Sequence, residues 1–242
     1  MIRAVTFDFW DTLYVEGPAM NRRQRLREDY TRGYLASIDK EVADSQLSYA
    51  FGILRHDLDH YRAVRHAAFD AEETGRRLAG AMGIKLGASE AARLGELISS
   101  AGRDEPPVPA DGAMPLLTAL HGRVALAIIS DTGMTLGHDL YAVMEADGIA
   151  QLLDHFTFSD QTGTTKPEVR QFHHTLYRLG CKPAQAVHVG DLEETDIVGA
   201  KQAGMRAIRI VHPDREPATA ADAAVGSVGE IIGPLREWGL RV

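Results

Sequence analysis

The chain has 242 residues, 45% of them hydrophobic and 25% charged, and its formal net charge is −8. That length can hold one large or two modest domains, and the negative charge disfavours binding to nucleic acid or to anionic membranes. One cysteine, Cys181, excludes an intramolecular disulfide and fits a reducing compartment. We expect a cytoplasmic protein without a signal peptide, since Asp8 interrupts the N-terminal apolar run, and without a membrane span, since no stretch approaches ~20 apolar residues.

Short apolar runs along the chain are typical of buried strands. They lie at residues 2–7, 124–129, 156–158, 186–189 and 207–211. Helical patterns lie between them, notably at 168–179 and 194–203, and a terminal helix is expected at 227–238. Strands that alternate with helices predict an α/β fold with a parallel, Rossmann-like sheet.

The segment from about residue 17 to residue 102 shows no convincing strand. Its helical stretches lie at 20–38, 44–69, 71–82 and 89–100, the last with Ser89 as a candidate N-cap. Pro106, Pro107 and Pro109 indicate a linker at 103–111. We therefore predict a core domain made of residues 1–14 and 105–242, with an all-helical cap domain, 15–104, inserted after the first strand.

Polar residues follow three of the predicted strands. Asp8, Ser130 and Asp191 each stand at or just past a strand end, and in open α/β sheets this edge forms the ligand-binding crevice. Asp191 and Asp196 lie at a loop-to-helix junction, and with Asp8 they make an oxygen-rich site suited to Mg²⁺. Lys166 precedes Pro167 at the start of a helix, where a fixed ammonium can neutralise a phosphoryl oxygen and keep Asp8 ionised.

The order of these motifs resembles the haloacid dehalogenase-like (HAD) superfamily. The motifs are Asp8-Phe9-Trp10-Asp11-Thr12-Leu13, Ser130, Lys166-Pro167, and Gly190-Asp191 followed by Asp196. The resemblance covers essentially the whole chain. It implies a Rossmann-like core, a cap that is usually a four-helix bundle, and a phosphatase acting on a small phosphorylated metabolite. The sequence indicates neither a macromolecular partner nor an oligomeric state.

The same resemblance implies roles for individual residues. Asp8 would be the nucleophile that forms an aspartyl-phosphate. Mg²⁺ would be held by Asp8, by the backbone carbonyl of Trp10 and by Asp191, with Asp196 as a further ligand or just behind the ligands. Ser130 and Lys166 would hold the phosphate as catalytic residues. Asp131 and Thr12 complete the substrate-binding set, Thr12 by supporting the nucleophile loop.

Trp10 departs from the family pattern. Phosphatases of the family usually read Asp-x-Asp-Gly-Thr, and their second Asp protonates the leaving group; here Trp10 holds that position and Asp11 stands where Gly is usual. An indole cannot act as an acid or base, and loss of a general acid typically costs ~10²–10⁴-fold in rate.

Three interpretations of this departure stay open. The chain is a phosphatase for good leaving groups, or one whose acid comes from the cap or from Asp11. Alternatively it is a carbon–halogen hydrolase, since the family's 2-haloacid dehalogenases carry Tyr at this position, although the retained Asp191 and Asp196 favour a metal site. In the third, it is a weakly catalytic or non-enzymatic binding protein on this fold.

Two further features have a structural and a functional interpretation. The cluster Arg22, Arg23, Arg25 and Arg27 opens the first cap helix, where an anionic substrate is conceivable but a solvated face with acidic neighbours is favoured. His188 lies inside a buried-strand pattern and is predicted to be a satisfied core histidine rather than a catalytic one.

Overall fold

A six-stranded parallel sheet forms the centre of the computed structural model, which describes residues 1–212 and 220–241. The strand order is β5-β4-β1-β6-β7-β8. The strands are β1 (Ala4–Phe7), β4 (Ala125–Ser130), β5 (His155–Phe158), β6 (Ala186–Gly190), β7 (Arg206–Ile210) and β8 (Ala223–Val225). Phe7 pairs in register with Ile128 of β4 and with Val189 of β6, so these three strands end at the same level. The predicted Rossmann-like parallel sheet is confirmed.

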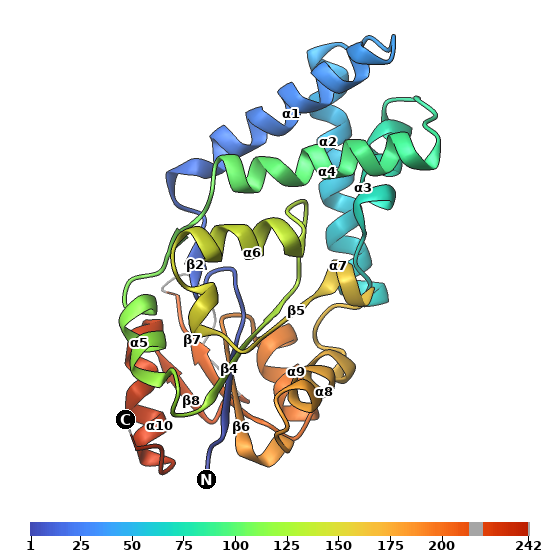
Figure 1. The fold of residues 1–242 in the computed structure, drawn as a ribbon. Helices are drawn as coiled ribbons and strands as arrows, with labels where there is room; N and C mark the ends of the chain where they lie inside the picture. The colour runs from blue at the N-terminus through green and yellow to red at the C-terminus, as the bar shows by residue number, and fades with distance from the viewer. Residues whose placement is uncertain (213–219, 242) are drawn as a thin grey trace.

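Helices cover both faces of the sheet (Figure 1). On one face Val5 and Phe7 pack with α5 (Ala113–Leu120), α6 (Gly137–Ala146) and α10 (Ile232–Glu237). On the other face Ala4 packs with α8 (Val169–Arg178) and α9 (Val198–Gln202). Because successive side chains of a strand point to opposite faces, a fully buried strand such as β1 has to be covered on both sides.

Four helices form a second layer beyond the carboxyl end of the sheet (Figure 1). They are α1 (Met20–Ser37), α2 (Asp44–His60), α3 (Ala71–Ala81) and α4 (Ala88–Asp104). This layer has its own core, in which Leu35, Phe51 and Leu94 are buried. Helices α3 and α4 touch through their backbones at Gly75 and Gly95. These residues have no Cβ, and a Cβ at either position would overlap a main-chain carbonyl of the other helix.

A short β ladder and a buried carboxylate are among the contacts that join the helical layer to the sheet domain. Where the chain leaves and returns, β2 (Tyr14–Val15) pairs antiparallel with β3 (Val108–Pro109). The buried Asp139 of α6 accepts hydrogen bonds from Ser99 Oγ at 2.5 Å and from Arg103 at 2.8 Å, both on α4. The predicted domain boundaries therefore fall within β2 and directly after α4, and the division itself stays a prediction. Residues 213–219 and 242 of the predicted core domain lie outside the part of the chain that the structure describes.

Some predicted elements differ from those observed. The predicted helix 44–69 is wrong at its end: α2 stops at His60, residues 61–65 form a π turn, and His66 has a left-handed φ of 46°. Ser89 is not an N-cap, because α4 begins at Ala88 and the Glu90 carboxylate accepts the Gly87 N–H at 2.8 Å. The linker predicted at 103–111 instead contains the last turn of α4 and strand β3.

Other elements escaped prediction. The strands β2, β3 and β8 are too short to show an alternating pattern. Helices α5 and α6 lack the clear separation of apolar and polar faces that marks α8. The predicted helix 194–203 divides into a π turn, Glu193–Ile197, and α9. No helix in residues 1–212 and 220–241 is long and apolar enough to cross a bilayer.

Candidate active site

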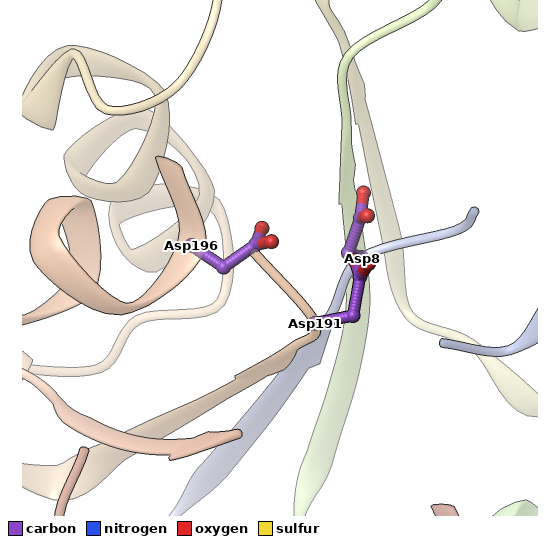
Figure 2. A group of neighbouring side chains, drawn as sticks. All are labelled: Asp8, Asp191 and Asp196. Atoms are coloured by element: carbon purple, nitrogen blue, oxygen red, sulfur yellow. The ribbon is translucent and has the colours of Figure 1, made fainter. Parts of the chain in front are cut away.

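The predicted polar residues meet at the carboxyl edge of the sheet. Asp8 follows β1, Ser130 ends β4 and Asp191 follows β6, and all three are buried. The common register of these strands brings together residues that lie far apart in the sequence. Figure 2 shows the Asp196 carboxylate reaching from its helical segment toward Asp8 and Asp191.

Three aspartates form a carboxylate cluster. One oxygen each from Asp8, Asp191 and Asp196 lies within 4.8 Å of the others. The Asp196 carboxylate can pack closely against the backbone at position 190 because Gly190 has no Cβ, which would overlap that carboxylate. Such an all-oxygen donor set has the chemistry that a hard divalent cation prefers. The residues present therefore fit a Mg²⁺ ion.

Lys166 lies between two of these carboxylates. Its Nζ is 2.7 Å from Oδ1 of Asp8 and 2.5 Å from Oδ1 of Asp196, and its side chain is 2% exposed. Burial alone would lower the pKa of Lys166, but the negative charges of Asp196 and Asp8 raise it above its usual range. Burial raises the pKa of Asp8 to about 7, although the Lys166 cation opposes that rise. The ammonium thus favours the ionised form of a carboxylate that burial would protonate.

Asp196 has protein donors on both of its oxygens. Oδ1 accepts from Lys166 and lies 3.2 Å from Nε2 of His188, while Oδ2 accepts from the Leu192 N–H at 3.0 Å. Burial alone would raise the pKa of Asp196, but Lys166 and His188 hold it well below its ordinary value. Because both oxygens of Asp196 already accept from the protein, its role is better explained as positioning Lys166 than as binding a metal ion directly.

His188 supports this arrangement from within β6. Burial lowers its pKa and favours the neutral ring. If Nε2–H donates to Asp196, Nδ1 is left to accept the Thr6 hydroxyl at 2.8 Å, so both ring nitrogens are satisfied. The structure therefore agrees with the prediction of a satisfied core histidine, and adds that its partner belongs to the carboxylate cluster.

Two predicted site hydroxyls are buried without a partner. Ser130 Oγ and Thr12 Oγ1 make no hydrogen bond to any residue that the structure describes, and both side chains are buried. Neither lines a cavity beside the cluster. Buried hydroxyls are normally hydrogen-bonded, so each of these two has an unsatisfied donor.

Two cavities open beside the cluster. The smaller, of 170 Å³, is lined by Asp8, Asp191 and Lys166, and the larger, of 530 Å³, extends beneath α1 and α2. Trp10, Arg62 and Asp131 line both, so they stand where the two cavities meet.

Asp131 lies at this boundary with one oxygen already engaged. Its Oδ1 accepts the Lys166 backbone N–H at 3.0 Å. Burial raises its pKa to about 6, against the opposing effect of the Lys166 cation. A carboxyl group with such a pKa exchanges its proton near neutral pH.

Arginines are the main residues that sequence reasoning misplaced or missed. In the Arg22–Arg27 cluster, the favoured solvated face is wrong for two members: Arg23 is buried and Arg27 half-buried, and both line the larger cavity. Buried Arg209 donates from Nε to the Asp191 carbonyl at 3.0 Å, and its place in the otherwise apolar run 207–211 is a signal that could have revealed it. Nothing in the local sequence of Arg62 marks its place between the cavities.

Comparisons with known proteins agree with this architecture. The family model of haloacid dehalogenase-like hydrolases matches residues 2–204. The glyceraldehyde 3-phosphate phosphatase of Methanopyrus kandleri is 28% identical over 98% of both chains. Its namesake from Methanothermobacter thermautotrophicus is 44% identical over 63 residues, and the match spans only 28% of that protein.

Solved structures show the same fold. A 2-haloacid dehalogenase from Pseudomonas syringae superposes with a TM-score of 0.69 at 25% identity, covering 99% of this chain and 100% of that one. A HAD phosphatase from Thermococcus onnurineus gives a TM-score of 0.66 at 22% identity, covering 99% of each chain.

Proposed function

Because the chain belongs to the haloacid dehalogenase-like hydrolase family, we propose that it is a Mg²⁺-dependent phosphatase of a small phosphorylated metabolite. The observation that carries the proposal is the contact of Lys166 with Asp8, 2.7 Å long, at the wall of a cavity that Asp191 also lines. The two relatives named glyceraldehyde 3-phosphate phosphatase support phosphate esters as the substrate class. A substrate of this kind also fits the predicted cytoplasmic location.

In the proposed mechanism Asp8 is the nucleophile. One of its oxygens forms a bond to phosphorus as the bond from phosphorus to the ester oxygen breaks, which gives an aspartyl-phosphate and an alkoxide. Water then attacks phosphorus as the bond from phosphorus to the Asp8 oxygen breaks. The proton of the water passes to the carboxylate that protonated the alkoxide, so phosphate leaves and the Asp8 carboxylate is restored. Lys166 favours the ionised form of Asp8 and faces the charge on the phosphoryl oxygens. Ser130, which ends β4 at the same edge of the sheet, is the proposed donor to the same oxygens.

The metal site would use the residues that face the smaller cavity. Asp8, Asp191 and the Trp10 backbone carbonyl would hold Mg²⁺, with Asp196 behind them as the residue that positions Lys166. When bound, Mg²⁺ supplies positive charge to the phosphoryl oxygens.

The leaving alkoxide needs a proton that Trp10 cannot give. Two carboxyl groups near Asp8 remain, Asp11 and Asp131. Asp11 lines only the smaller cavity, whereas Asp131 stands where the cavities meet, between the nucleophile and the space for the alcohol part of a substrate. We therefore propose that Asp131 donates the proton to the alkoxide. Its raised pKa of about 6 leaves part of the Asp131 population protonated near neutral pH.

A second candidate function is 2-haloacid dehalogenation, which the aromatic side chain of Trp10 favours. The similarity to the Pseudomonas syringae dehalogenase supports the same alternative. The carboxylate cluster of Asp8, Asp191 and Asp196 weighs against it, because displacement of halide by Asp8 requires no such donor set.

A substrate panel separates these functions. Phosphate esters, acyl phosphates and 2-haloacids are assayed with Mg²⁺ and with EDTA, for the wild type and for Asp191→Asn. We expect hydrolysis of phosphate esters that requires Mg²⁺ and is strongly reduced in Asp191→Asn. Full activity on a 2-haloacid in EDTA would establish the dehalogenase instead, and no turnover of any compound would leave a binding protein.

A further inference from the structure

The larger cavity is lined by an unusual number of arginines. Arg23 and Arg27 come from α1, Arg55 from α2, and Arg62 from the π turn that follows α2. The cavity measures 530 Å³, a size typical of small-molecule sites. Since Trp10 and Asp131 line both cavities, a molecule that reacts at Asp8 can extend past them into this space.

Two of the three acidic groups that line the cavity are already paired. Glu16 accepts from Arg23 at 2.5 Å, and Asp59 accepts from Arg62 at 3.0 Å. The third, Asp131, faces the Lys166 backbone at the catalytic end. Arg27 and Arg55 form no ion pair with any carboxylate in the described parts of the chain. The cavity therefore has positive charge that the protein does not neutralise.

Arg23 and Arg27 also have buried nitrogens without acceptors. Arg23 is 2% exposed and is fixed by Glu16 and by the Glu105 carbonyl, yet its Nη2 has no partner among the described residues. Arg27 donates from Nη2 to Thr135 Oγ1 at 2.9 Å, while its Nε is likewise buried and unpartnered. The two residues are four apart, so they share one face of α1. A buried guanidinium without its acceptors is costly, and an anion in the cavity would remove that cost.

The electrostatics of Arg27 point the same way. Burial lowers its pKa to about 10, and the positive charges of Arg23 and Arg55 add to the lowering. Arg27 is still a cation at neutral pH, and the one carboxylate that opposes this lowering, Glu16, is already paired with Arg23. The Arg23 guanidinium is meanwhile held 5.7 Å from the centre of the Trp10 ring, so the tryptophan that replaces the usual acid forms one wall of the cationic space.

We propose that the alcohol part of the substrate carries a second anionic group, a carboxylate or a second phosphate, which Arg27 and Arg55 bind together with the free nitrogen of Arg23. The proposal rests on the proposed phosphatase function and specifies its substrate class. Trp10 would contact the carbon skeleton between the two anionic ends. A substrate whose far end is uncharged, such as glyceraldehyde 3-phosphate, would leave the arginines unpaired and be the poorer substrate.

The test compares two three-carbon esters that differ at one end. Glyceraldehyde 3-phosphate ends in an aldehyde, and 3-phosphoglycerate ends in a carboxylate. We expect the wild type to have a kcat/KM ratio that favours the carboxylate by about tenfold or more, and Arg27→Met and Arg55→Met each to lower this ratio several-fold, toward one. Fructose 1,6-bisphosphate and fructose 6-phosphate, compared in the same way, show whether the second anion is a phosphate.

Arg25→Met is the matched control, because Arg25 is exposed on the same helix and does not line the cavity. This variant should keep the wild-type ratio. A ratio near one for both pairs of esters would overturn the proposal, as would a high ratio that Arg27→Met and Arg55→Met leave unchanged. The exposed position of Arg55 makes its variant usable even if Arg27→Met does not fold.

Failure of the phosphatase function is recognised separately. If the wild type hydrolyses no phosphate ester, including p-nitrophenyl phosphate, the binding of 3-phosphoglycerate is measured by calorimetry. Binding that is about tenfold weaker in Arg55→Met than in wild type would support the anion site by itself. Equal binding to both proteins would overturn it.

Discussion

Lys166 is bound to Asp8 by an ion pair of 2.7 Å in which neither side chain is more than 8% exposed. The same ammonium holds Asp196 at 2.5 Å, so one cation serves two buried carboxylates. In the proposed mechanism this contact keeps the nucleophile ionised. It also ties the activity of the site to its stability, because no other lysine or arginine of the described residues forms an ion pair with Asp8 or Asp196.

Lys166→Met is therefore expected to reduce both activity and stability. Removal of one partner from a buried ion pair typically lowers the free energy of unfolding by about 3–5 kcal/mol. Chemical denaturation at pH 7 measures this change. The control is Lys201→Met, whose partly exposed ion pair with Asp222 should contribute no more than about 1 kcal/mol. Equal losses in the two variants would show that Lys166 has no special electrostatic role.

Trp10→Asp is expected to restore the family's usual acid. The gain should be largest for alkyl phosphates, whose alkoxide needs a proton, and small for p-nitrophenyl phosphate, whose leaving group does not. A general acid typically contributes ~10²–10⁴-fold, and even partial restoration should change the ratio of the two kcat/KM values measurably. Trp10→Phe serves as the control for loss of the indole. An unchanged ratio in Trp10→Asp would mean that another acid already works at full effect.

Asp131→Asn tests the proposed source of the proton. We expect it to slow hydrolysis of alkyl phosphates by about 10²-fold and to affect p-nitrophenyl phosphate much less. Asp11→Asn, made for comparison, should not reproduce this dependence on the leaving group. The assignment fails if Asp11→Asn shows the dependence and Asp131→Asn does not.

Asp131 should also make stability depend on pH. Its pKa is about 6 in the folded protein, against 3.8 for an unperturbed aspartate, so between these values the folded state binds the proton more tightly. Stability from this group is therefore full below about pH 4 and is lost as pH rises through about 6. The free energy of unfolding of Asp131→Asn minus that of the wild type is measured at pH 4 and at pH 8, in EDTA. This difference should be about 1–3 kcal/mol more positive at pH 8 than at pH 4. An equal change in the exposed Asp111→Asn would contradict this account.

The sheet and the carboxylate cluster were predictable because they depend on local patterns. Apolar runs located β1, β4 and β6, and the rule that parallel strands end at one edge brought Asp8, Ser130 and Asp191 together. The sequence also predicted that Lys166 acts on Asp8. Its contact with Asp196 was not predicted, because it depends on the packing of segments that lie far apart in the sequence.

The arginines show where sequence reasoning reaches its limit. Arg22, Arg23, Arg25 and Arg27 are adjacent in a polar stretch, and their equal chemistry hides which of them face inward. Tertiary packing buries Arg23 against Glu16 and Glu105 and half-buries Arg27 against Thr135, while it leaves Arg22 and Arg25 exposed. The helix end at His60 was missed for a similar reason, because a left-handed residue such as His66 carries no strong sequence signal.

The central claim is that Asp8 accepts the phosphoryl group, and acid-quenched mass spectrometry during turnover of p-nitrophenyl phosphate with Mg²⁺ tests it most directly. We predict that the peptide containing Asp8 gains the mass of one phosphoryl group in the wild type, and that Asp8→Asn shows neither this adduct nor turnover. Hydrolysis by Asp8→Asn at the wild-type rate, or a phosphoryl group found on another residue, would contradict the account.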